Sequence, residues 1–361
     1  MPPAPPQKLL PFVQGLRALA AFFVAFAHIG HDAVQNGGDP NFWLAPALGF
    51  IPWGAGVDVF FVISGFVIVH ASAPLFGTGR AGAITFLHRR FARIIPLYWI
   101  MSALFLVVLL LSRSAIHGDI GGPLYIAASF LFLPWPRPDG VMQPPLGLGW
   151  TLNYEMFFYA AFAPFLFLPR PRAVIAAILV LGSFVAIGHF HPFAAPQLAY
   201  WSNPIILEFC AGMVLAQLFA AGVTLPVTLR LTLPLLALTG LHLASILPAW
   251  RIVGFGVPAI MLVAAAALAP APATLSRASR LLVRLGDASY AMYLVHPFIM
   301  RGFALLAARL HAHGEAMGLL YVAAGLAIAQ ACALLINGTL ERHLNALLRR
   351  RRVRNVSIPA Y

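Results

Sequence analysis

Charged side chains are scarce in this sequence. Of its 361 residues only 9% are Asp, Glu, Lys or Arg, whereas 61% are hydrophobic and the mean hydropathy is +0.87. Because a soluble domain has roughly 25% charged residues, the composition excludes an ordinary soluble protein and predicts a polytopic membrane protein. Cysteine is also rare: Cys210 and Cys332 lie alone in apolar runs, outside any CxxC or metal-ligand spacing. No disulfide framework is therefore predicted.

Acidic residues are scarcer than basic ones, with 10 Asp and Glu against 23 Lys and Arg and a formal net charge of +13. A basic chain can indicate nucleic-acid binding, but here the arginines gather in short links between apolar runs, as the positive-inside rule produces. We therefore expect the lipid bilayer as a partner and no nucleic acid, and we place the links in the cytoplasm. These basic links are residues 80–93, 170–172, 277–284 and 342–354.

The apolar runs indicate how often the chain crosses the membrane. The run at 122–133 is too short for the ~20 residues that a spanning helix needs, and leaving it out puts every basic link on the side of the N-terminus. The sequence thus predicts an all-α integral membrane protein with about ten transmembrane helices, both termini in the cytoplasm, and a re-entrant or interfacial segment near 122–133. The other runs lie near 9–31, 50–71, 94–112, 148–168, 173–190, 203–220, 227–248, 251–269, 285–308 and 317–338.

The two ends of the chain are predicted to flank a single domain. The opening MPPAPPQK is proline-rich and has no short apolar region, so it is not a cleavable signal, and we expect a disordered cytoplasmic stub at 1–8. The arginine-rich C-terminal segment indicates a basic cytoplasmic tail at 339–361. No repeat of fixed period and no separate soluble domain is visible, so one transmembrane domain is expected within 1–361.

The first apolar run carries two ionisable residues, Arg17 and His28. A helix rises ~1.5 Å and turns ~100° per residue, so they lie about 16 Å apart on nearly the same face. Ionisable groups inside a membrane helix are costly and usually mark a functional site. His28 is therefore a candidate acid or base, the alternative being a polar side chain that a neighbouring helix satisfies. His28, His31 and Asp32 also share a face that could hold Zn²⁺, but without a fourth ligand we expect no metal.

A guanidinium cluster lies where the segment FLHRRFARIIPLYW (86–99) meets the membrane. Arg89, Arg90 and Arg93 come directly before an apolar run. Such a cluster suits the phosphates of a nucleotide-bearing cofactor, and it is equally typical of an anchor that binds lipid headgroups. The residues alone leave both interpretations open.

Acidic and aromatic residues mark the second and fifth spanning runs. The carboxylate of Asp58 lies within the second run and needs a polar partner there. Ser64, in the same run, lacks the Gly-x-Ser-x-Gly pattern of a nucleophile. We expect its small side chain to allow close helix packing. Trp150, Tyr154 and Glu155 open the fifth run near the external mouth. The aromatic rings can bind a sugar or form an interfacial belt. The carboxylate can orient the candidate base, bind a hydroxyl, or pair with an arginine.

A polar stripe runs through the late segment GDASYAMYLVHPFIMR (286–301). Ser289, Tyr293 and His296 are spaced i, i+4 and i+7, so they share one face of a helix. Pro297 should free backbone carbonyl groups there. His296 is thus a second candidate acid or base, or a substrate contact, and a simply packed histidine is the alternative.

Five features in order resemble the bacterial membrane acyltransferase family 3, the O-acyltransferases that modify surface polysaccharides. Each is weak alone, but together they are specific and cover almost the whole chain. The sequence stops at Tyr361 without the external SGNH hydrolase-like domain of some members, so it is similar to the stand-alone exopolysaccharide and lipopolysaccharide acetylases. The features are the pattern of an arginine, ten residues and a histidine at Arg17 and His28, and the segments GVDVFFVISGFVI (56–68), RRFARIIPLYW (89–99), WTLNYEMFFY (150–159) and SYAMYLVHPFI (289–299).

The resemblance implies acyl transfer from a cytoplasmic acyl-CoA, usually acetyl-CoA as co-substrate, to a hydroxyl of an extracytoplasmic carbohydrate. The protein would then be a multi-pass protein of the bacterial inner membrane. His28 would correspond to the family's catalytic histidine, Arg17 to its essential arginine, and Arg90 and Arg93 to its donor-binding motif.

We expect further residues in the site besides His28, Arg17, Arg90 and Arg93. We expect Glu155 to act with His28 and Arg17 in catalysis, and Arg89 and Arg17 to join the other arginines in holding the donor. The alternative function is a transporter or flippase for a lipid-linked sugar or acyl group, although the two halves show no paired repeats. The sequence predicts no oligomeric state. The expected contacts of the acceptor are Trp150, Tyr154, Tyr290, His296 and Asp58.

Overall fold

The computed structural model describes residues 10–37, 44–111, 121–137, 139–270, 272, 274–310 and 314–344. The expected stub at 1–8 and the tail beyond residue 344 lie outside these ranges. Within them the chain forms helices joined by short links, with one isolated antiparallel bridge between Pro136 and Met142 and no strand. The all-α prediction is therefore confirmed for the described part of the chain.

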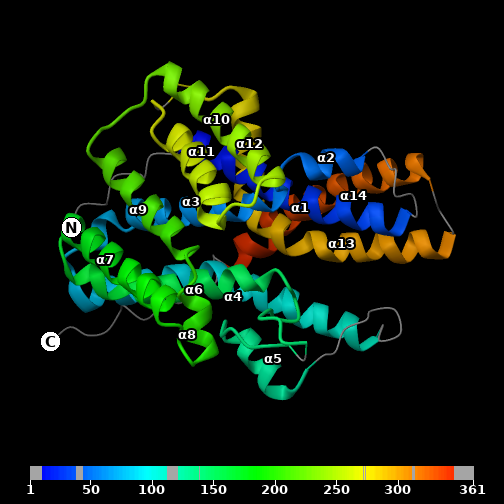
Figure 1. The fold of residues 1–361 in the computed structure, drawn as a ribbon, viewed down its shortest axis with the longest axis horizontal. Coiled ribbons are helices and arrows are strands. Elements are labelled where there is room, and N and C mark those ends of the chain that lie inside the picture. Colours follow the sequence, from blue (N-terminus) through cyan, green and yellow to red (C-terminus); the bar gives the residue numbers. More distant parts are fainter. Residues whose placement is uncertain are drawn as a thin grey trace.

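The helices follow the predicted apolar runs closely (Figure 1). Shorter helices lie in the links: α2 (Leu44–Phe50), α5 (Pro123–Phe130), α8 (Pro196–Trp201) and α12 (Arg277–Asp287). The long helices are α1 (Pro11–Gly37), α3 (Gly56–Ala71), α4 (Gly79–Leu111), α6 (Gly149–Phe162), α7 (Arg170–Phe190), α9 (Ile206–Ala220), α10 (Val227–Ile246), α11 (Val257–Ala267), α13 (Ser289–Leu310) and α14 (Glu315–Ile336).

Six helical stretches in the described ranges are long and apolar enough to cross a membrane. They contain α1, α3, α4, α7, α10 and α14, and two further apolar helices, Ile206–Ala220 and Ile252–Ala267, are shorter. A helix needs ~20 residues to span the hydrocarbon core, so length alone does not assign the shorter ones. The expected count of about ten crossings, and the side on which the termini lie, stay predictions.

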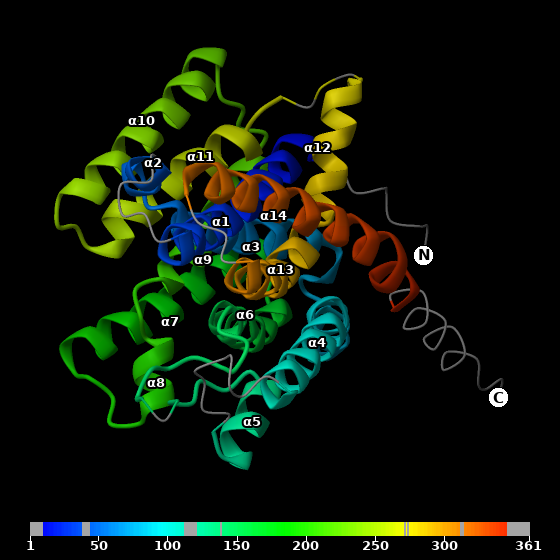
Figure 2. The same cartoon turned by 90° about the vertical axis from the view of Figure 1, so that its right-hand side faces the viewer.

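The segment near 122–133 is helical only over the eight residues of α5, which is too short to cross a bilayer. It lies beside the outer end of α4 (Figure 2). The indole Nε1 of Trp99 donates to the carbonyl oxygen of Phe130 at 2.9 Å and ties the two helices together.

Helix α4 differs from the predicted boundary. The sequence places a basic link before a spanning run at 94–112, but α4 is one helix of 33 residues that continues through Pro96. The proline ring removes a single backbone N–H, and membrane helices tolerate this where neighbours satisfy the freed carbonyl. Arg90 and Arg93 therefore project from a continuous helix rather than from a loop.

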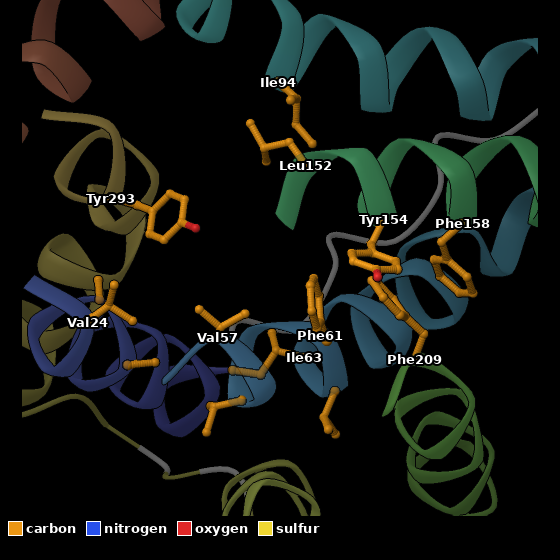
Figure 3. Packing of buried hydrophobic residues seen from close by; sticks show 14 of the residues in the cluster. Val24, Val57, Phe61, Ile63, Ile94, Leu152, Tyr154, Phe158, Phe209 and Tyr293 are labelled. Atoms are coloured by element: carbon orange, nitrogen blue, oxygen red, sulfur yellow. The ribbon is translucent and has the colours of Figure 1, made fainter. Parts of the chain in front are cut away.

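The centre of the bundle depends on close backbone contact between α3 and α9. A Cβ atom on Gly65 would lie 2.0 Å from the carbonyl oxygen of Phe209, and one on Gly212 would lie 2.0 Å from that of Val62. Small residues permit this approach. Beside the contact, the ring of Phe209 packs against those of Phe158 and Phe61, with centroids 4.4 and 4.8 Å away (Figure 3).

Helices α1, α3, α9 and α13 occupy the middle of the molecule in Figure 2, with α10 and α11 beyond them on one side and α4, α7 and α8 on the other. Elements from both ends of the sequence thus meet at the centre. The first apolar run lies beside the late segment, which places their polar stripes next to each other.

Candidate active site

A cavity with charged groups in a largely apolar wall lies between α1, α3, α4, α6 and α13. Its empty space, including the part open to solvent, is about 760 Å³. Apolar side chains of α3, such as Phe60 and Ile63, form much of its wall. Helices that are far apart in the sequence therefore build one site. The polar residues in its lining are Arg17, Ser64, Arg90, Arg93, Thr151, Glu155, Tyr159, Ser289, Tyr290 and Tyr293.

Arg17 is oriented in this cavity by neutral groups. Its Nη1 donates to Oε1 of Gln14 and its Nη2 to Oγ of Ser289, both at 3.0 Å. Gln14 is in turn held through its Nε2, which donates to Oδ1 of Asp287 at 2.8 Å. Gly286 allows this contact, because a Cβ there would lie 2.1 Å from the Gln14 carbonyl oxygen. The positive charge of Arg17 is positioned without a carboxylate bonded to it in these contacts.

Glu155 is held by two hydroxyl groups. Ser64 donates from Oγ to Oε1 of Glu155 at 2.7 Å, and the hydroxyl of Tyr159 donates to the same oxygen. Ser64 is thus part of the cavity wall, which corrects the expectation that it serves only close packing. The structure shows these two hydroxyls against Glu155, whereas His28 is not among the residues that line the cavity with it.

The cavity holds more positive than negative charge. Its described lining contains the guanidinium groups of Arg17, Arg90 and Arg93 against the single carboxylate of Glu155. The ion pairs found among the described residues involve other arginines, and the buried Nε of Arg90 has no hydrogen-bond partner there. Arg89 is exposed and does not line the cavity. Unpaired guanidinium groups in a cavity favour an anionic ligand.

His28 of α1 and His296 of α13, which are far apart in the sequence, contact each other outside the described lining of this cavity. Nδ1 of His28 lies 3.1 Å from Nε2 of His296, and the rings are nearly parallel, with centroids 5.2 Å apart and an interplanar angle of 18°. His296 is fully buried, whereas His28 is exposed. The structure therefore places the late-segment histidine against the candidate base.

The other two residues of the possible zinc trio have separate partners. Nδ1 of His31 lies 2.6 Å from the carbonyl oxygen of Ala27, and a carboxylate oxygen of Asp32 accepts from the hydroxyl of Tyr321. Within the described ranges, no three His, Cys, Asp or Glu side chains are grouped as a metal site requires.

Tyr293 lies between the cavity and the histidine pair. Its hydroxyl donates to the carbonyl oxygen of Leu148 at 3.0 Å and lies 3.0 Å from Oγ1 of Thr151. Its ring centroid is 6.2 Å from that of His296, and Figure 3 shows the ring projecting from α13 into the space between Leu152 and Val57. Tyr290, which we expected to contact the acceptor, lines the arginine cavity instead and donates to the carbonyl oxygen of Ile94 at 2.9 Å.

A second charged cluster lies apart from the cavity. Asp58 is fully buried and pairs with Arg251, whose Nη2 lies 2.6 Å from Oδ2 of Asp58. Glu208 is also fully buried and neighbours Asp58. The guanidinium of Arg251 lies over the rings of Phe255 and Trp150, 5.0 and 6.0 Å from their centroids. Asp58 thus has the partner that its burial requires.

Tyr154 also packs inside the protein. It is 3% exposed, its ring stacks on Tyr200 with centroids 4.5 Å apart, and its hydroxyl donates to the Tyr200 carbonyl oxygen at 2.8 Å. Tyr200 returns a hydrogen bond from its hydroxyl to the carbonyl oxygen of Trp150 at 3.0 Å. These contacts fix the start of α6.

The profile of a known family, described as an acyltransferase domain, matches residues 10–338, which include every helix of the cavity. The chain belongs to this acyltransferase family. The predicted resemblance is therefore confirmed. With several helices long and apolar enough to cross a membrane, the protein is a multi-pass membrane acyltransferase.

Curated relatives of this acyltransferase come from several bacteria. It is 35% identical over 248 residues to the exopolysaccharide production protein ExoZ of Rhizobium meliloti (strain 1021), covering 68% of this chain and 75% of ExoZ. It is 30% identical over 322 residues to the acyltransferase MdmB of Streptomyces mycarofaciens, covering 81% and 79%. It is 26% identical over 252 residues to the peptidoglycan O-acetyltransferase OatA of Listeria monocytogenes serovar 1/2a, covering 65% and 38%. No solved structure matches the chain.

Two residues that hold charged side chains in place, Gln14 beside Arg17 and Arg251 beside Asp58, were not found from the sequence. Gln14 precedes Arg17 by three positions and therefore shares its helix face, which is a usable signal. Arg251 is the first residue of the predicted run at 251–269, away from the basic links, and only its isolation distinguishes it.

Proposed function

We propose that this acyltransferase transfers an acyl group, acetyl in the simplest case, from cytoplasmic acyl-CoA to a hydroxyl of an extracytoplasmic carbohydrate. The observation that carries the proposal is the pair of polar sites along α1. One is a cavity with surplus guanidinium groups at Arg17, and the other is the histidine pair at His28. Eleven helical residues separate them by about 16 Å.

The arginine cavity suits the donor. Coenzyme A carries phosphate groups, and guanidinium groups bind phosphate with paired, charge-assisted hydrogen bonds. Arg90 and Arg93 project from the same helix into the cavity, and the buried Nε of Arg90 lacks a partner. In the proposed complex they hold the phosphates, and the pantetheine arm extends along α1 past Arg17. The exposed Arg89 instead faces lipid headgroups.

The histidine pair suits the transfer step. His28 removes the proton from the acceptor hydroxyl as its oxygen attacks the thioester carbonyl. The C–S bond then breaks, the acyl group leaves on the acceptor oxygen, and the CoA thiolate takes up the proton that His28 held. Proton transfer by a positioned base contributes roughly 10²–10⁴ in rate. The exposure of His28 allows an acceptor to reach it.

The proposed topology puts these two sites on different sides. With about ten crossings and the basic links inside, as the positive-inside rule favours, the arginine cavity opens toward the cytoplasm of a bacterial inner membrane. The histidine pair then lies toward the outside, where envelope glycans are found. The names of two relatives concern exopolysaccharide production and peptidoglycan O-acetylation, which supports a glycan acceptor.

The proposal is tested with the purified full-length protein in detergent and acetyl-CoA. Wild type should bind acetyl-CoA saturably and release CoA thiol when an acceptor glycan is added. Arg93→Ala should lose binding, His28→Ala should bind but release no thiol, and Arg80→Ala should match wild type, since Arg80 is exposed on the same helix outside the cavity. If wild type binds no acyl-CoA, the proposed donor is wrong.

A further inference from the structure

The hydrogen bonds of His296 define which of its ring nitrogens carries a proton. Nδ1 of His296 lies 3.1 Å from the carbonyl oxygen of Met292. A carbonyl oxygen can only accept, so Nδ1 carries the hydrogen and donates. The carbonyl of Tyr293 is a second acceptor close by, because Pro297 has no N–H to occupy it in the helix.

The other nitrogen of His296 must then accept. His296 is fully buried within α13, and a buried imidazolium without a carboxylate partner would carry a large desolvation cost. The ring is therefore neutral, and a neutral imidazole has one N–H only. With Nδ1 protonated, Nε2 holds a lone pair, and its neighbour at 3.1 Å is Nδ1 of His28.

The same logic extends to His28. Its Nδ1 faces the lone pair on Nε2 of His296, so the single proton of neutral His28 lies on Nδ1 and Nε2 is left as the basic nitrogen. The backbone carbonyl of Val24 is a second acceptor for the His28 ring. A directional chain results, from Nδ1 of His28 to His296 and from His296 to the Met292 carbonyl. Its backbone end cannot reverse, because a carbonyl has no proton to give.

We propose that His296 is a positioning residue that fixes the tautomer of His28, leaving Nε2 of His28 free to take the proton of the acceptor hydroxyl. This inference rests on the proposed function for its catalytic meaning, but the tautomer itself does not depend on it. The role parallels that of the carboxylate that orients the base in a Ser-His-Asp triad. Here the acceptor is neutral.

The contact also supports the reaction after proton transfer. When Nε2 of His28 gains a proton, the ring becomes an imidazolium, and its Nδ1–H bond to His296 becomes charge-assisted and stronger. The two rings are nearly parallel, with an interplanar angle of 18° and centroids 5.2 Å apart, which fits a hydrogen bond between their edges. The base thus keeps its orientation in both protonation states.

The test combines nitrogen-15 NMR of histidine-labelled protein in detergent with kinetics. The shifts of a neutral imidazole distinguish the protonated from the unprotonated ring nitrogen, and the His28→Gln spectrum identifies the signals of His28. In wild type we expect a proton on Nδ1 of His28 and none on Nε2. A wild-type spectrum with the proton on Nε2 would overturn the inference.

Two variants of His296 separate positioning from simple packing. His296→Gln keeps an oxygen that accepts from His28 and an amide that donates to Met292, so the tautomer and most of kcat should remain. His296→Met fills similar space without an acceptor, so His28 keeps only the Val24 carbonyl as acceptor and the share of the Nδ1-protonated tautomer should fall below that of wild type. Its kcat should fall about 10-fold or more, within the roughly 10⁴-fold that a wrong tautomer costs in a catalytic triad.

Binding of acetyl-CoA serves as the folding control, because the donor cavity does not include His296. The KM for acetyl-CoA should stay unchanged in both variants. If His296→Met keeps the wild-type tautomer and kcat, the positioning role is refuted. If instead wild type releases no CoA from any acyl-CoA, the proposed function fails, and the spectrum still decides the tautomer.

Discussion

The contact between α3 and α9 gives a quantitative prediction for Gly65→Ala. The added Cβ would lie 2.0 Å from the carbonyl oxygen of Phe209 and 2.8 Å from its carbonyl carbon, whereas real Cβ atoms essentially never approach closer than 3.0 Å. The neighbouring atoms belong to backbone and cannot rotate away as a side chain would. The two helices must therefore separate by about 1 Å at this point.

The loss of stability in Gly65→Ala depends on the packing that this separation of the helices disrupts. Overpacking a well-packed interior typically costs about 1–3 kcal/mol. Here the ring of Phe209 also loses part of its contact with Phe158 and Phe61, whose centroids lie 4.4 and 4.8 Å away. We therefore expect Gly65→Ala to destabilise the protein by about 3 kcal/mol, at the upper end of that range.

Thermal unfolding of the purified protein in one detergent measures this effect. Gly182→Ala in α7 is the matched control, because its Cβ would meet nothing within 4 Å and alanine in a helix is favoured over glycine by about 0.5–1 kcal/mol. The control should melt at or above wild type, and Gly65→Ala clearly below it. Equal melting temperatures for Gly65→Ala and wild type would refute the backbone contact.

Three further predictions concern charge. Arg251→Met removes the ion-pair partner of the fully buried carboxylate of Asp58 and should lower the free energy of unfolding by about 3–5 kcal/mol. The control Arg137→Met breaks an exposed ion pair and should lower it by no more than about 1 kcal/mol. Thermal unfolding should show a clearly lower melting temperature for Arg251→Met than for Arg137→Met. Glu155→Gln removes the carboxylate of the cavity lining, so a titration should show tighter acetyl-CoA binding, and weaker binding would contradict the charge argument. Acetyl-CoA affinity should also fall as salt rises; an affinity independent of salt would speak against phosphate recognition by the arginines.

The helical architecture was predictable because a chain with such an apolar composition crosses a bilayer as helices. Apolar runs bounded by arginines located nearly all the helices, since a spanning helix requires such a run. The extension of α4 to Gly79 was not predictable in this way. The first turns of α4, which carry Arg80, Arg89 and Arg90, are polar enough to look like a link in the sequence, and only the structure shows that the helix is continuous there.

The site was predictable in its residues but not in its pairings. Periodicity assigns a side chain to a face of its own helix, so Arg17 and His28 were found as one stripe. It does not say which helix lies opposite. The partners Ser289 and His296 are 272 and 268 residues away in the chain, and no local pattern encodes that contact. For the same reason, the sequence did not indicate that Tyr290 lines one cavity with Arg17, Arg90 and Arg93.

The position of Tyr293 is relevant to how tightly the protein seals the membrane against ions. A protein that joins a cytoplasmic donor to an outside acceptor must let a small group cross without short-circuiting the ion gradients on which the cell depends. The Tyr293 hydroxyl is bonded to the Leu148 carbonyl and lies beside Thr151, and the residue lines the arginine cavity while its ring centroid lies 6.2 Å from that of His296. We expect this side chain to keep the water of the two sites apart. In the proposed reaction, this enzyme would work as an insulator as well as a catalyst.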